Sequence, residues 1–293
     1  PKTWVKRLDD PAQRGPALKR LDEMYQGAMS SANSNRDDPK VKGIIDDADE
    51  ALVKVYTTQQ LDEKTRKDLI KLIADMGDPR GAPAFAKAFK DYEPGKNDED
   101  VKFAAQGTSR LSTQGKLNDQ GLIDALWECF SKFKPSQAKS INLVQDLASA
   151  VKTVKHPTYG AKAAALLSMP IPDPKNVNDQ RDYLQFWQQT SAQLIGDTKY
   201  AAGIAPLVKV LLTPSKAALS LPVRTALMKM PKGGPPAMAS TPATSPQPSS
   251  GCDSVRPEIS EMRCVPFTCA TLPTAKKIAD LVRLCMVMCS RPA

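Results

Sequence analysis

A turn signal returns about every 40 residues along this chain, and this recurrence constrains the fold more than any other feature. The leading residues of five signals stand at positions 38, 78, 118, 156 and 197, so the steps between them are 40, 40, 38 and 41. An earlier Asp-Pro pair begins at position 10. A unit of two helices that recurs at this period can bury its apolar face only against its neighbours. The sequence therefore predicts stacked helix pairs with turns near 10, 38, 78, 118, 157 and 197.

The segments between these turns carry apolar residues at helical spacing. Aromatic residues make up 5% of the chain, which disfavours sheets because strands prefer β-branched and aromatic side chains. No sustained alternating pattern bounded by hairpin turns is present. The stripes predict an all-α chain up to about Met230, and they are formed by Val41, Ile44, Ile45, Ala48, Leu52 and Val55; by Leu69, Leu72, Ile73 and Met76; by Ile141, Val144, Leu147, Ala148, Val151 and Val154; and by Tyr183, Leu184, Trp187, Ser191, Leu194 and Ile195.

The stretch Gly77-Asp78-Pro79 lies between two such stripes and allows two interpretations, a polar binding loop or a simple helix junction. Gly supplies the positive φ with which many helices end, Asp caps free amide groups, and Pro suits the first turn of a helix. We therefore interpret the stretch as a junction between two helices.

Two of the units resemble the HEAT-repeat family of α-solenoids. "MGDPRGAPAFAKAFKDY" is echoed by "IGDTKYAAGIAPLVKVLL", and the second helices open with "EDVKFAAQGTSRL" and "LPVRTALMKM". The resemblance covers residues 3–230 and implies a right-handed α-solenoid of about five to six helix-turn-helix repeats. It also implies a structural role at the turns and in a ladder of polar contacts between units, for Gly77, Asp78, Pro79, Lys102, Gly196, Asp197 and Arg224. Lys102 stands where the family has Arg, and lysine cannot form a two-pronged pair with a carboxylate.

The opening "TWVKRL" is similar to the start of exported bacterial HEAT-repeat proteins, which are often lipid-anchored. The first residue is Pro rather than Met, so we expect that an N-terminal signal segment is absent from this chain. The resemblance implies a periplasmic or lipid-anchored location, with the cytoplasm as the alternative. No stretch approaches the length of apolar residues needed to span a bilayer, and we expect a monomer.

The composition changes abruptly after Met230. Residues 231–274 are rich in Pro, Ser and Gly and predict a low-complexity linker that orders poorly, and residues 275–293 include one amphipathic run that predicts a short C-terminal helix. Three interpretations of 231–293 stay open: a disulfide-bonded or metal-binding appendage, a linker whose final helix packs on the repeats, or a tail read from a shifted frame. We favour the third, because composition, repeat and cysteine usage all change at one point. The segment contains five cysteines, and their spacing does not determine their redox state. They are Cys252, Cys264, Cys269, Cys285 and Cys289.

No arrangement of residues in the sequence points to catalysis. His156 is the one histidine, and its position before Pro157 favours a capping or solvent-facing role. Neither a nucleophile-elbow motif nor a metalloprotease motif is present. The acidic cluster 46–50 lies on a predicted helix, and we expect it on the solvent side. We therefore predict a protein that is not an enzyme and has no catalytic, cofactor or metal residues.

The remaining hypotheses concern binding. The net charge is +9, and residues 1–230 carry 34 basic and 28 acidic residues, or +6, but the two signs alternate as on a solvated helical surface. We expect a scaffold whose curved surface binds a protein or peptide, and the alternative is a binder of nucleic acid or another polyanion through a basic concave face. The candidate partner-binding residues are Phe186, Arg66 and Arg110. Phe186 lies off its apolar stripe, where an exposed aromatic residue would anchor a partner, but packing in the core or between repeats is the favoured interpretation.

Overall fold

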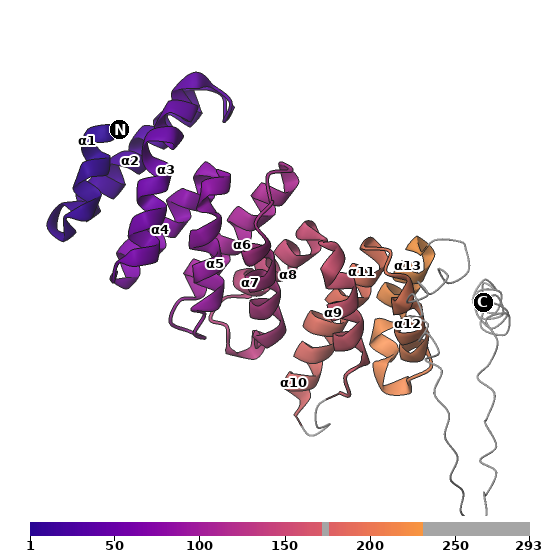
Figure 1. Ribbon diagram of the computed structural model, residues 1–293. Helices are drawn as coiled ribbons and strands as arrows, with labels where there is room; N and C mark the ends of the chain where they lie inside the picture. The colour runs from indigo at the N-terminus through magenta and orange to yellow at the C-terminus, as the bar shows by residue number, and fades with distance from the viewer. Residues whose placement is uncertain (172–175, 231–293) are drawn as a thin grey trace, which may run out of the picture. The chain divides into compact units, whose positions relative to one another are not determined.

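The computed structural model describes residues 1–171 and 176–230. Every regular element in these residues is helical, and they contain no strand (Figure 1). This confirms the prediction that the chain up to about Met230 is all-α. The linker and final helix predicted within 231–293, and the five cysteines there, lie outside the described residues.

The α-helices differ in length and are joined by short loops. In chain order they are α1 (Lys2–Val5), α2 (Pro11–Ser31), α3 (Pro39–Thr58), α4 (Glu63–Met76), α5 (Ala82–Lys90), α6 (Asp98–Thr113), α7 (Gln120–Lys132), α8 (Ile141–Val154), α9 (Pro157–Ser168), α10 (Val177–Asp182), α11 (Gln189–Asp197), α12 (Ile204–Leu211) and α13 (Ser220–Lys229). Five 3-10 segments and one π-helical segment, η4, connect or extend them: η1 (Lys6–Asp9), η2 (Pro79–Gly81), η3 (Pro135–Gln137), η4 (Tyr183–Gln188), η5 (Ala201–Gly203) and η6 (Pro214–Leu219).

Helices begin where the sequence places its turn residues. Asp10, Asp38, Asp78, Asp119 and His156 each accept a hydrogen bond from a backbone N–H in the first turn that follows, at 2.7–3.4 Å. Such caps satisfy amide groups that have no partner inside the helix. The turn near 197 differs, because Asp197 is the last residue of α11 and the next helical segment begins at Ala201.

Neighbouring helices pack in pairs, and the pairs lie side by side (Figure 1). The pairs are α3 with α4, α5 with α6, α7 with α8, α9 with α11, and α12 with α13. One row of contacts between pairs runs through α2, α4, α6, α8, α11 and α13. On the other side, α3 contacts α5, which contacts α7, and α9 contacts α12. The apolar stripe of each pair is thus covered by the next pair.

Polar contacts between pairs join residues about one sequence period apart. Several hydrogen bonds connect positions separated by 36 to 41 residues. Among them are Gln106 with Asp146, Arg110 with Ala74, Ser112 with Thr153, Asp98 with Lys139, Tyr159 with Ile123, and Lys162 with Asp124.

The predicted apolar stripes are buried in α3 and α4, and the stripe of α8 is confirmed except at its first member. Ile141 is 67% exposed, because it is the first residue of the helix after the Ser140 cap. The other predicted members are buried (Leu147, Val151) or partly buried against the core (Val144, Ala148, Val154). Leu143 and Ala150 are buried as well, which the predicted stripe did not include.

Phe186 packs in the core, as the favoured interpretation predicts, and is not exposed for partner binding. Phe186 is 5% exposed and lies between Phe130 and Phe133, with ring centroids 4.9 and 5.3 Å away. It belongs to the π-helical segment η4, whose wider turn advances the side chains by less than 100° per residue. Phe186 therefore faces the core together with Tyr183, while Trp187 is half-buried and donates its indole N–H to the Phe130 carbonyl at 2.9 Å.

Candidate functional site

The junction after α4 has the geometry that its sequence predicts. Gly77 has φ +63° and ends the helix, and its N–H donates to the Ile73 carbonyl at 3.2 Å. Asp78 caps η2, and Pro79 is the first residue of that segment. A side chain at Gly77 would place its Cβ 2.7 Å from Cδ of Arg110. The stretch therefore ends one helix and starts the next.

The ladder implied by the family resemblance is not formed at Lys102. Its ammonium group pairs with Glu99 one turn earlier on α6, at 2.9 Å, and not with Asp78. Asp78 pairs with Arg80, which also reaches Asp46 on α3 at 2.8 Å. A lysine has no planar fork with which to join two carboxylates, whereas the Arg80 guanidinium does so.

The second predicted turn has a different construction. Asp197 pairs with Lys229 at 2.6 Å, and Arg224 is exposed on α13. Gly196 is not a turn residue, because it lies within α11 and is buried. A Cβ at Gly196 would lie 2.7 Å from Cα of Ala226, so this glycine permits close contact between α11 and α13.

Arg110, a predicted partner-binding residue, is engaged with the end of α4. Its guanidinium donates to the Ala74 carbonyl and lies 3.8 Å from the Asp75 carboxylate. Burial, with the nearby positive charge of Arg36, lowers the pKa of Arg110. These contacts give Arg110 a structural role at a helix C-terminus, where cations are favoured.

The expectation that the acidic cluster 46–50 lies on the solvent side is wrong at Asp49, so only part of the cluster faces solvent. Asp49 is 0% exposed, and neither of its carboxylate oxygens has a hydrogen-bond partner. Burial raises its pKa to about 7, nearby Asp78 adds to the rise, and Arg80 opposes it. The sequence pattern gave one signal, since Asp49 directly follows the buried Ala48 and precedes Leu52 by three positions.

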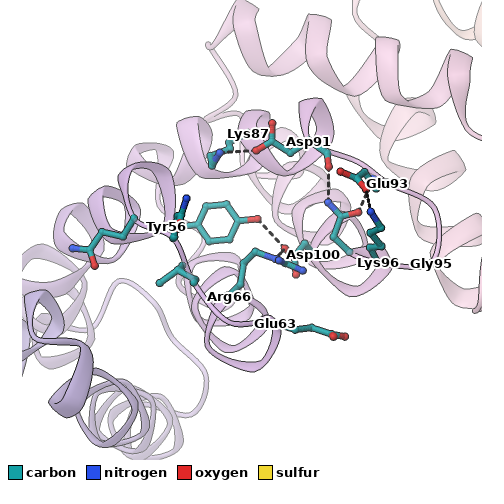
Figure 2. A pocket seen from close by; sticks show the side chains of 13 residues that line it. Tyr56, Glu63, Arg66, Lys87, Asp91, Glu93, Gly95, Lys96 and Asp100 are labelled. Atoms are coloured by element: carbon teal, nitrogen blue, oxygen red, sulfur yellow. Dashed lines mark hydrogen bonds and ion pairs between the residues drawn. The ribbon is translucent and has the colours of Figure 1, made fainter.

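A hollow with a volume of about 710 Å³ lies at one edge of the helix pairs. Its walls come from the end of α3, the loop 59–62, the first turns of α4, the end of α5, the loop 91–97 and the start of α6. Most of the lining residues are charged or carry an amide group, and the lining consists of Tyr56, Gln59, Gln60, Leu61, Glu63, Arg66, Lys87, Asp91, Glu93, Gly95, Lys96, Asn97 and Asp100 (Figure 2).

Three of these residues form a buried polar group in the wall of the hollow. Asp100 is 2% exposed, and its carboxylate accepts from Nε of Arg66 and from the hydroxyl of Tyr56, the latter at 3.2 Å (Figure 2). Burial raises the pKa of Asp100, while the Arg66 charge and both hydrogen bonds oppose the rise. The pKa of Tyr56 is raised by burial and by the adjacent Asp100 charge. Tyr56 therefore stays protonated and acts as a donor at neutral pH.

The rim of the hollow carries two further ion pairs. Lys87 pairs with Asp91 at the end of α5, and Lys96 pairs with Glu93 in the following loop (Figure 2). Both pairs are largely exposed, and exposed pairs contribute little stability. Glu63 makes no ion pair within the described residues. The rim can therefore exchange its present partners for those of a ligand at small cost.

Of the predicted partner-binding residues, Arg66 alone lines this hollow. The sequence offered no signal for Tyr56 or Asp100, because the periodic pattern records which helix face is apolar and not which polar residues meet. Among the described residues, no group of three or more His, Cys, Asp or Glu side chains is placed to hold a metal ion.

No family model, curated protein or solved structure matches this chain. No helix in residues 1–171 and 176–230 combines the length and apolar character that a membrane span requires.

Proposed function

We propose that this protein is a non-enzymatic scaffold that binds a protein or peptide partner, and that the hollow around Arg66 is its recognition site. In this proposal the helix pairs form a right-handed, HEAT-like α-solenoid of about five to six units. The period of the turn signals and the polar contacts between pairs at 36 to 41 residues support it.

One observation carries the choice of a peptide partner: an open hollow of about 710 Å³ in which most of the lining residues are charged or amide-bearing. Sites for small molecules are predominantly apolar, with few polar groups. Here Tyr56, Leu61 and the aliphatic stems of the long side chains supply apolar surface, while Gln59, Gln60 and Asn97 offer amide groups that can pair with a peptide backbone. No Ser, Cys or His lines the hollow, so it cannot form the Ser–His or Cys–His pair of nucleophilic catalysis.

The charge of the hollow also separates the two binding hypotheses. Its lining holds three basic residues (Arg66, Lys87, Lys96) and four acidic residues (Glu63, Asp91, Glu93, Asp100), which gives 3 − 4 = −1. A groove for nucleic acid gathers positive charge. The hollow therefore favours a mixed-charge peptide over a polyanion.

The proposal is tested by selecting peptides from a random phage-displayed library against the immobilised chain. Selected sequences are then synthesised with a fluorophore and titrated with the wild-type protein and with two variants of α5. Lys87→Glu reverses a charge in the lining, and Lys90→Glu reverses an exposed charge on the same helix outside it. We expect Lys87→Glu to weaken binding at least about fivefold and Lys90→Glu to change it less than about twofold.

Equal effects of the two variants would place the binding surface elsewhere. A library that yields no sequence above background, while the protein binds duplex DNA with an affinity that falls steeply with salt, would favour the polyanion alternative.

A further inference from the structure

Arg66 is held rigidly in the wall of the hollow. Its Nε donates to Asp100, which also accepts from the Tyr56 hydroxyl, and Asp100 is almost fully buried. The Arg66 side chain itself is 29% exposed and lines the hollow. A buried carboxylate therefore fixes the guanidinium plane before any ligand arrives, which lowers the entropy cost of using it.

The rest of this guanidinium is available. The group has five N–H donors, of which the Nε–H is spent on Asp100. No acceptor in the described part of the chain is bonded to the two terminal nitrogens of Arg66, which carry the other four donors. The hollow thus contains an oriented guanidinium group whose terminal N–H groups have no acceptor in the described part of the chain.

The geometry of that edge selects a ligand class. Two parallel N–H groups match the two oxygens of a carboxylate in a bidentate pair. Lys87 and Lys96 on the rim add positive charge, but Glu63, Asp91 and Glu93 in the same lining disfavour a doubly charged anion such as phosphate. The hollow as a whole thus accommodates a single negative charge at Arg66 better than two.

We propose that Arg66 binds a carboxylate of the partner peptide, with Asp100 and Tyr56 as positioning residues. The inference rests on the proposed function and specifies its chemistry. The carboxylate belongs either to an acidic side chain or to the C-terminus of the partner, and small probes distinguish these two sources.

Four capped dipeptides serve as probes in a titration followed by the Nε–Hε signal of Arg66 in NMR spectra. Acetyl-Gly-Gly carries a terminal carboxylate, acetyl-Gly-Glu-amide carries a side-chain carboxylate, and acetyl-Gly-Gly-amide and acetyl-Gly-Gln-amide are their uncharged counterparts. We expect one or both carboxylates to shift the Arg66 signal with a Kd of about 1–10 mM, while the uncharged counterparts leave it unchanged. The stronger carboxylate identifies the source.

Three variants make the assignment specific. Arg66→Lys keeps a cation beside Asp100 but loses the fork, and we expect carboxylate affinity to fall at least about tenfold. Since removal of Arg66 alone would leave a buried charge unpaired, the double variant Arg66→Gln/Asp100→Asn removes both charges together, and we expect it to fold without binding carboxylate. Glu63→Gln removes a competing negative charge, and we expect binding about twofold tighter.

The inference is overturned if neither carboxylate probe shifts the Arg66 signal up to about 20 mM, or if Arg66→Lys binds them as tightly as wild type. Failure of this inference is distinguishable from failure of the proposed function. If Lys87→Glu weakens binding of the library peptides, but amidation of their C-terminus and replacement of their acidic residues leave it unchanged, the peptide site is supported and the carboxylate pairing at Arg66 is contradicted.

Discussion

Asp49 is expected to make the stability of this protein fall as pH rises from 4 to 8. Its carboxylate is fully buried without a hydrogen-bond partner, and burial raises its pKa from the ordinary 3.8 to about 7 in the folded state. Because the folded state binds the proton more tightly, the contribution is fully present below the unfolded pKa and is lost as pH rises through 7. At about 1.4 kcal/mol per unit, the loss is about 4 kcal/mol.

The perturbation that isolates this term is Asp49→Asn, which keeps the shape and removes the charge. We expect the variant to match wild type within about 1 kcal/mol at pH 4 and to exceed its free energy of unfolding by about 2–4 kcal/mol at pH 8. Urea unfolding, followed by far-ultraviolet circular dichroism at several pH values, measures this difference. Glu50→Gln, an exposed neighbour on the same helix, is the control and should change stability by less than about 0.5 kcal/mol at every pH.

Arg80 provides a second check on the same reasoning, because its charge opposes the rise in the Asp49 pKa. Arg80→Gln should destabilise the wild-type chain more at pH 8 than at pH 4, and this extra loss should be smaller in the Asp49→Asn background, where only the pairs of Arg80 with Asp46 and Asp78 remain. A difference between Asp49→Asn and wild type that stays constant from pH 4 to 8 would refute the argument. It would mean that water or a rearranged Arg80 already satisfies the carboxylate.

Two glycines and one cysteine give further predictions. Gly196→Ala should cost about 1–3 kcal/mol of unfolding free energy, because its Cβ would meet the backbone of Ala226, and chemical denaturation measures this. Gly77→Ala should cost about 1–2 kcal/mol, chiefly through φ +63°, since the nearest atom belongs to the flexible Arg110 side chain; a stabilised variant would contradict the helix-end role. Burial raises the pKa of the Cys129 thiol to about 12, so alkylation by iodoacetamide at pH 8, followed by peptide mass spectrometry, should modify Cys129 slowly in the native protein and rapidly in urea.

The sequence predicts helix starts well because a cap is a local device. Asp38, Asp78 and Asp119 act on amides two or three positions away, so the residue type and its place before an apolar run carry the information. Phe186 shows where such reasoning fails. A π-helical turn changes the angle between successive side chains, and no residue type in that stretch indicates it, so a stripe drawn at 3.6 residues per turn omits Phe186 from the covered face.

The candidate site could not be predicted for a different reason. Apolar periodicity tells which side of a helix is covered, and Asp49 shows that even this fails for a polar residue that lies on the covered side. The group around Asp100 depends on which polar side chains from neighbouring pairs meet. Tyr56 lies 44 positions before Asp100, and Arg66 lies 34 positions before it, so the two residues come from opposite helices of the preceding pair.

The separation of 44 residues is longer, and that of 34 residues shorter, than the steps of 38 to 41 between turn signals. This difference arises because the two partners of Asp100 come from opposite helices of one pair. One partner of Asp100 comes from the end of α3 and the other from the start of α4, so both lie beside the short loop 59–62 that joins these helices. The hollow therefore opens where the loop of one pair faces the loop of the next, at the edge of the stack and outside the apolar stripes. The rim lysines Lys87 and Lys96 lie outside the packing that fixes the helices, so a change such as Lys87→Glu should alter binding without altering the unfolding free energy by more than about 0.5 kcal/mol. Arg66 differs from them, because the buried Asp100 ties it to the interior, and this attachment makes it the most constrained cation in the hollow.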